Sequence, residues 1–186
     1  MANTCMTTVT INGDQDELKC LAKIIDEAMN DPDPTRRGWL GHLLCDYEKE
    51  VSHRGEISYF EETDDQLFLD IETAWSPMMG PIKLIVERYA PNAEIIFTAE
   101  EPGSEIFVSN DPCVIGMYEV WGSECFPNMP DDYRGIGDLI SEKELKPLLE
   151  QSLGHTGEMA DLVAEMNELD DVSIHRYEQA LVDEFC

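Results

Sequence analysis

Residues 66–75 show the clearest structural pattern in the chain, an alternation of side-chain type from one position to the next. The odd positions hold Leu67, Leu69, Ile71, Thr73 and Trp75. The even positions are mostly polar and include Asp70 and Glu72. Because successive side chains of a strand point to opposite faces, this pattern predicts a strand with one face in a core and one toward solvent. The chain must therefore contain a sheet that is covered on one side.

Other strand and helix patterns surround this segment in a recognisable order. Strands are predicted over residues 6–11, 56–62, 66–75, 93–101 and 105–109, and a last strand-like run covers 113–121. One helix is predicted after the N-cap Asp14 and another after Ser76-Pro77. A short apolar segment near Trp39 and Leu43 is expected to be helical and to pack as a cover over the core. The order β-α-β-β-α-β with a further hairpin predicts an α+β fold, a ferredoxin-like split βαβ sheet with an extra hairpin.

The composition changes after Gly122, where apolar residues recur with helical spacing. Helices are predicted over residues 142–149, 158–169 and 173–185, and the last two are expected to form an αα-hairpin. We therefore predict two parts, a ferredoxin-like α+β domain over residues 1–122 and a C-terminal helical appendage over residues 123–186.

The charge of the chain excludes several classes of protein. Forty acidic residues against 12 Lys and Arg give a formal net charge of −28. Such a protein would repel the phosphates of nucleic acid, so direct nucleic-acid binding is not expected. No apolar run approaches the ~20 residues of a membrane span, and the first residues do not resemble a signal peptide. We expect a cytoplasmic protein, in a host cell, that contacts no membrane.

Cysteine and histidine spacing gives no sign of a cofactor. The six cysteines form no C-x-x-C pair, and the four histidines are isolated from one another. Zinc sites generally need closer pairs, so free thiols in a reducing compartment are expected. Phosphate-binding, dinucleotide-binding and nucleophile-elbow motifs are absent from the sequence. We expect no cofactor, no metal and no enzymatic activity.

The acidic residues gather in clusters that could imitate phosphates. Carboxylates on alternate strand positions lie about 6.7 Å apart, a spacing of the order found along a nucleic-acid backbone. A protein channel lined by Arg and Lys could accept them. The candidate partner-binding residues are Glu61, Glu62, Asp64, Asp65, Asp70, Glu72, Glu100, Glu101, Glu105, Asp131 and Asp132.

Part of the sheet region resembles a known family. The matching segments are Thr73-Ala74-Trp75-Ser76-Pro77, Tyr89-Ala90-Pro91, Ile95-Ile96-Phe97 and Glu100-Glu101-Pro102-Gly103 with Phe107. Over residues 71–109 the chain is similar to YubB-like proteins, which have a ferredoxin-like domain and occur on plasmids and phages. Met78 stands where that family has a second proline, and the family's glycine after Phe107 is absent. The resemblance implies the fold and a mobile genetic element as the source.

These features favour an inhibitor of a host defence nuclease, of the anti-CRISPR or anti-restriction type. Its carboxylates would occupy a basic nucleic-acid channel of a nucleic-acid-binding protein, for which an RNA-guided nuclease such as Cas9 is our first expectation. The alternative is a structural or regulatory interaction module that forms a homodimer or docks a partner through its C-terminal helices. In that case the acidic residues only keep the protein soluble.

Overall fold

The computed structural model describes residues 3–44, 54–122, 138–169 and 172–186. The chain has the expected mixed α+β character and divides into two compact units. The first comprises Met1–Asp111 and Ala180–Cys186, and the second comprises Pro112–Gln179. The sequence placed this division at residues 122 and 123 and assigned the whole C-terminus to the second part. Within the described residues, no helix combines the length and apolarity that a membrane crossing requires.

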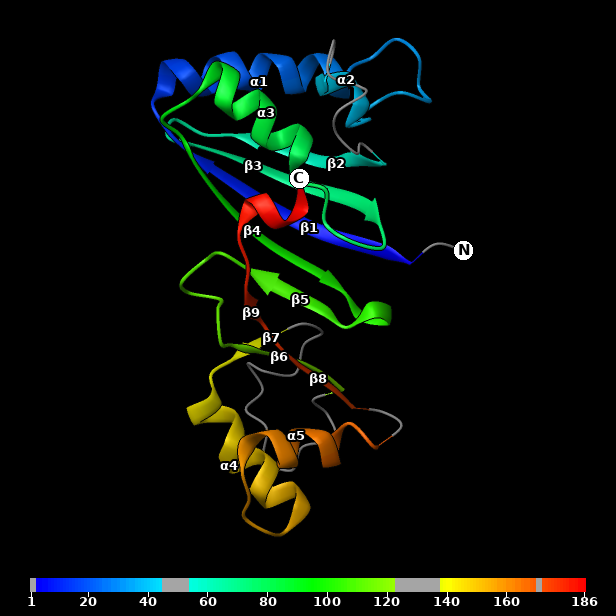
Figure 1. Ribbon diagram of the computed structural model, residues 1–186, viewed down its shortest axis with the longest axis vertical. Helices are drawn as coiled ribbons and strands as arrows, with labels where there is room; N and C mark the ends of the chain where they lie inside the picture. The colour runs from blue at the N-terminus through cyan, green and yellow to red at the C-terminus, as the bar shows by residue number, and fades with distance from the viewer. Residues whose placement is uncertain (1–2, 45–53, 123–137, 170–171) are drawn as a thin grey trace. The chain divides into compact units, whose positions relative to one another are not determined.

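Five strands of the first unit lie side by side in an antiparallel sheet (Figure 1). Their order is β2 (Gly55–Glu62), β3 (Gln66–Ala74), β1 (Thr4–Asn12), β4 (Glu94–Glu101) and β5 (Ile106–Ser109). All five predicted strands are confirmed to within two residues at each end. The two central strands, β1 and β3, are paired along their whole length, from Thr4 opposite Ala74 to Asn12 opposite Gln66.

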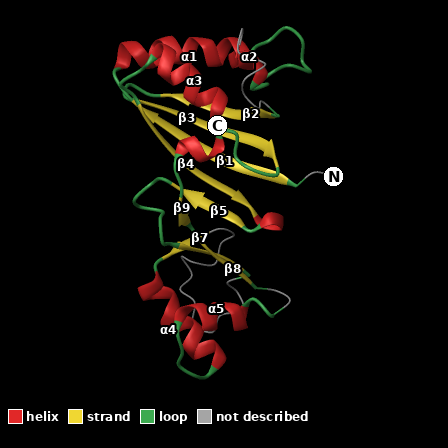
Figure 2. Ribbon diagram, in the orientation of Figure 1, coloured by secondary structure: helices red, strands yellow, loops and turns green. Residues whose placement is uncertain are grey.

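Helices cover one face of this sheet, as Figure 2 shows in red above the yellow strands. They are α1 (Gln15–Met29), the short α2 (Gly41–Leu44) and α3 (Gly80–Tyr89), with the 3-10 helices η2 (Pro102–Ser104) and η5 (Val182–Phe185) elsewhere in the unit. Asp14 is the N-cap of α1, as predicted, and its side chain accepts a hydrogen bond from the Asp16 amide. Leu21 and Ile25 of α1 are buried in one core with Ile82 and Ile85 of α3.

Strand β3 follows the predicted alternation except at Trp75, the last residue of the predicted strand. Leu67, Leu69, Ile71 and Thr73 are buried beneath the helices. Trp75 was predicted on the same face, but its side chain is 53% exposed. The strand ends at Ala74, and Trp75 has a positive φ of 74°, which turns its side chain away from the core. Its amide donates to the Asn3 carbonyl oxygen at 3.0 Å, which holds this turn in place.

The second unit contains a small antiparallel sheet in the order β7 (Asp138–Ile140), β6 (Tyr118–Trp121) and β8 (Ser173–Arg176). Helices α4 (Glu142–Leu153) and α5 (Met159–Met166) share a core with these strands, and the two-residue β9 (Glu178–Gln179) follows β8. Val120, Ile174, Leu145 and Leu162 are buried in that core. Of the predicted strand-like run 113–121, only the last four residues form a strand.

The helix predicted over residues 173–185 is wrong, and with it the αα-hairpin. This segment forms β8, β9 and η5. Ile174 lies opposite Val120 of β6, and the side chain of Asn167 bonds both the amide and the carbonyl oxygen of Ile174. Buried side chains three residues apart, Ile174 and Tyr177, imitated a helical pattern because the chain bends after β8. The appendage is therefore a mixed α+β unit. The predicted αα-hairpin, through which the alternative hypothesis would form a homodimer or dock a partner, is not formed.

Candidate functional site: an acidic face of the sheet

The five strands of the first unit are strongly acidic. Together they contain eight Asp and Glu residues and, within their described bounds, no Lys or Arg. The acidic residues are Glu56, Glu61, Glu62, Asp70, Glu72, Glu94, Glu100 and Glu101. Successive side chains of a strand point to opposite faces, so these carboxylates are divided between the two faces of the sheet. Those that share a face repel one another, and their distribution decides which face can bind a positively charged partner.

The strand register brings three glutamates into one row on the face opposite the helices. Glu56 of β2 is directly opposite Glu72 of β3, Glu72 is opposite Met6 of β1, and Met6 is opposite Glu100 of β4. Residues paired in this way on one face have Cβ atoms about 4.5–5.5 Å apart. The row therefore places carboxylates across four neighbouring strands, with one methionine between them.

A second row lies beside the first and contains Tyr59, Asp70 and Thr8. The Thr8 hydroxyl donates to Asp70 Oδ1 at 3.1 Å. A bulge between Ile57 and Tyr59 shifts the register of β2, and this shift brings Tyr59 opposite Asp70. One row further on, Glu61 accepts a hydrogen bond of 2.7 Å from the Tyr59 hydroxyl, which raises the pKa of that phenol. We call Glu56, Glu61, Asp70, Glu72 and Glu100, with Met6, Thr8 and Tyr59, the acidic face.

The acidic face also presents apolar side chains to solvent. Met6 is 39% exposed and Tyr59 is 48% exposed, and both lie among the carboxylates. A surface that served solubility alone would not need them. Aromatic residues and methionine are enriched where proteins bind other proteins, and the carboxylates around them add charge selectivity.

One end of the glutamate row opens into a hollow of about 420 Å³. Trp39 and Arg54 line it together with Glu56 and Glu72. Arg54 immediately precedes β2. The other Lys and Arg residues described in the first unit lie in α1, α3 and the segment between α1 and α2: Lys19, Lys23, Arg36, Arg37, Lys83 and Arg88. Apart from Arg54, the positive charges described in this unit thus belong to α1, α3 and the segment between α1 and α2.

Several predicted site residues lie elsewhere. Glu62 is opposite Leu67, and Glu101 is on the core side of β4 with only 2% of its surface exposed. Glu101 Oε1 accepts from the Gly103 amide at 3.1 Å, and Oε2 has no hydrogen-bond partner among the described residues. Glu101 therefore cannot contact a partner directly in this structure.

The remaining predicted residues are in loops or outside the described chain. Asp64 and Asp65 lie in the β2–β3 turn, where Asp64 accepts a hydrogen bond from the Gln15 side chain at 3.0 Å. Glu105 is an exposed residue with a positive φ of 56° between η2 and β5. Asp131 and Asp132 lie outside the described residues.

Sequence reasoning missed Glu56 and Tyr59 as members of the site. Glu56 was placed in a predicted strand, but only the pairing of β2 with β3 sets it opposite Glu72. The orientation of Tyr59 depends on the bulge at Ser58, which alternation alone does not predict. Four predicted residues, Glu61, Asp70, Glu72 and Glu100, do share the acidic face.

In comparisons with known proteins, no family model, no curated protein and no solved structure matches the chain. The resemblance of residues 71–109 to YubB-like proteins stays a prediction. In the part of the chain that the structure describes, no three His, Cys, Asp or Glu side chains converge to hold a metal ion.

Proposed function

We propose that this protein inhibits a host defence nuclease, of the anti-CRISPR or anti-restriction type, by placing its acidic face in the nuclease's nucleic-acid channel. The observation that carries the proposal is the row formed by Glu56, Glu72 and Glu100 across neighbouring strands. A rigid sheet holds these carboxylates in place before binding, so little side-chain and backbone entropy is lost on association.

The apolar members of the acidic face support a protein as the partner. Met6 and Tyr59 can pack against the aliphatic stems of Lys and Arg while the carboxylates pair with their charged ends. Nucleic acid would be repelled by the same surface. An RNA-guided nuclease such as Cas9, which holds its heteroduplex in a positively charged channel, is the partner class that best fits this combination.

The separation of charge within the first unit supports a directed approach. Six of its described basic residues lie in or between the helices, whereas the five strands, as described, have none. α1, α3 and the segment between α1 and α2 also contain seven acidic residues, so this side is nearly neutral. A basic channel would therefore attract the sheet much more strongly than the helical side, which favours an approach with the acidic face forward.

We further propose that the first unit has the ferredoxin-like split βαβ arrangement. The order β2-β3-β1-β4, with α1 following β1 and α3 following β3, supports this assignment, and β5 extends the sheet beside β4. Membership of the YubB-like family and origin from a phage or plasmid are proposed from the sequence resemblance over residues 71–109 alone.

The test is inhibition of target cleavage by a Cas9–guide complex, with a restriction endonuclease assayed in parallel. The informative variant combines Glu56→Gln, Glu72→Gln and Glu100→Gln. The matched control combines Glu27→Gln, Glu87→Gln and Glu184→Gln, which removes the same charge from exposed positions in helices of the same unit. We expect the control to inhibit like the wild type and the acidic-face variant to lose inhibition. Equal inhibition by both variants, or no inhibition of any basic nuclease, would overturn the proposal.

A further inference from the structure

A groove runs between the three helices of the first unit, separate from the acidic face. It has a volume of about 360 Å³, at the lower end of the range for small-molecule sites. Its floor is formed by Ala28 of α1, Leu43 of α2 and Ile85 of α3, all buried. Half-buried Ile24 and Leu84 add to the apolar lining. The groove would therefore accept an apolar body of modest size.

The groove lining includes an arginine, Arg88, that forms no ion pair with another residue of the described part of the chain. Among the described residues no carboxylate lies within ion-pair distance of Arg88, whose guanidinium stays 5.3 Å from the ring centre of Tyr89. This is notable in a chain with 40 acidic residues. Glu27 also belongs to the groove lining, but its carboxylate pairs with Lys23 at 3.9 Å. Arg88 is thus available to an anion that enters from solvent.

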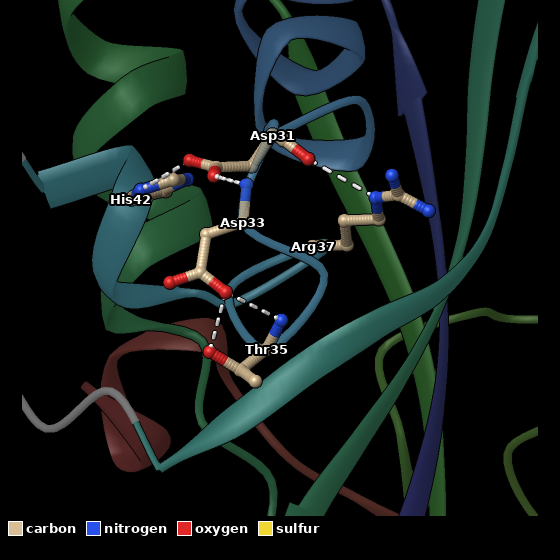
Figure 3. A network of polar contacts seen from close by, with 5 residues as sticks. All are labelled: Asp31, Asp33, Thr35, Arg37 and His42. Carbon is tan, nitrogen blue, oxygen red and sulfur yellow. Dashed lines mark hydrogen bonds and ion pairs between the residues drawn. The ribbon is translucent and has the colours of Figure 1, made fainter.

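One residue of the groove lining, His42, belongs to a polar network drawn in Figure 3. Asp31 Oδ2 contacts His42 Nε2 at 3.0 Å, and Asp31 Oδ1 accepts from the Asp33 amide at 2.7 Å. Arg37 Nε donates to the Asp31 carbonyl oxygen at 3.0 Å. His42 lines the groove and is largely buried, so this network holds its ring in one position. Because the His42 ring is held in place before a ligand binds, it favours one orientation of the ligand in the groove.

We propose that this groove binds a small monocarboxylic acid, with its apolar part on the floor formed by Ala28, Leu43 and Ile85 and its carboxylate on Arg88. The proposal is independent of nuclease inhibition because no groove residue belongs to the acidic face.

Hexanoate is a suitable probe, with hexan-1-ol and hexylamine as neutral and cationic analogues of the same length. Titration calorimetry of the full chain should give saturable millimolar or tighter binding of hexanoate. Arg88→Gln should weaken it about tenfold, the effect of losing one charge-assisted contact, whereas Arg88→Lys should retain part of it. The control Lys19→Gln removes an exposed positive charge from α1 at a residue that does not line the groove. It should bind hexanoate like the wild type.

Three results would overturn the proposal. The first is no saturable hexanoate binding to the wild type at millimolar concentration. The second is equal affinity for hexanoate and hexan-1-ol, which would remove the role of the anion. The third is unchanged hexanoate affinity in Arg88→Gln while that variant unfolds at the wild-type temperature.

Discussion

Glu56 of β2 and Glu72 of β3 lie directly opposite each other on the same face of the sheet. Like charges in such a cross-strand pair destabilise a sheet, so the first unit keeps this pair at a cost in stability. We predict that Glu56→Gln stabilises the first unit by about 0.2–1 kcal/mol, measured by urea unfolding. The gain should shrink at high salt, which screens exposed charges.

The control for that prediction is Glu94→Gln. Glu94 also belongs to this face but lies opposite the neutral Asn12, so its substitution should leave stability nearly unchanged. If Glu56→Gln stabilises no more than Glu94→Gln, the two opposed carboxylates do not repel each other significantly.

Gly38 sits where a side chain has no room. Its φ is +69°, and a Cβ there would lie 2.3 Å from the carbonyl oxygen of Ile57. The Ile57 amide in turn donates to the Gly38 carbonyl oxygen at 2.7 Å, so the backbone cannot move away without losing this bond. We predict that Gly38→Ala destabilises the first unit by more than the ~1–2 kcal/mol of a left-handed residue alone.

Gly154 provides the comparison, since its φ is +77° but a Cβ there would have no atom of the described chain within 4 Å. Gly154→Ala should therefore cost only about 1–2 kcal/mol, the strain of the backbone conformation. Thermal and urea unfolding of the two variants measure the difference. Equal losses would mean that the Gly38–Ile57 contact relaxes freely.

The C-terminal segment stabilises the first unit from the end of the chain. The ring of Phe185 packs edge-on against that of Phe97 at 5.9 Å, and the Phe185 carbonyl oxygen accepts from the Met79 amide. We predict that Phe185→Ala costs about 1–3 kcal/mol, less than for a fully buried phenylalanine because Phe185 is only half-buried. Denaturant unfolding followed by Trp fluorescence would detect the loss, and an unchanged midpoint would contradict this packing role.

His155 of the second unit should make stability depend on pH. The Thr156 carbonyl oxygen and the Glu165 carboxylate, 3.3 Å and 2.9 Å from its ring nitrogens, raise the pKa of His155 above its ordinary value. A raised pKa in the folded state means that the charged imidazole stabilises the fold at pH values below about 6.5. This contribution is lost as the pH rises through the folded-state pKa.

The measurement is the stability difference between the wild type and His155→Gln across that pH range. The wild type should be the more stable protein in mild acid, and its advantage should disappear in mildly alkaline buffer. A constant difference across the range would show that the interaction does not depend on the charge of His155.

The strands and helices of the first unit were predictable because local patterns determine them. Alternation specified β3, and Asp14 marked the start of α1. The helix expected after Ser76-Pro77 begins only at Gly80, so Met79 and not Ser76 is its N-cap, and Pro81 lies in its first turn. In the tail, Ile174 and Tyr177 fit a helical spacing, and only pairing with β6 decides that the segment is a strand.

The acidic face was predictable only in part, because it depends on register. Adjacent residues of a strand point to opposite faces, so the pairs Glu61-Glu62 and Glu100-Glu101 are each divided between the two sides of the sheet. Neither this division nor the position of Glu56 opposite Glu72 can be read from one strand alone. The bulge at Ser58 adds a further shift that composition does not reveal.

The most direct test of the central claim is the salt dependence of binding to a Cas9–guide complex, measured as the dissociation constant of three proteins. These are the wild type, the acidic-face variant Glu56→Gln, Glu72→Gln, Glu100→Gln, and the helix control Glu27→Gln, Glu87→Gln, Glu184→Gln. We predict that wild-type and control binding weakens about tenfold or more from low to moderate salt, whereas the acidic-face variant binds weakly at both. Tight, salt-independent binding by all three proteins would contradict the claim that the acidic face occupies a basic channel.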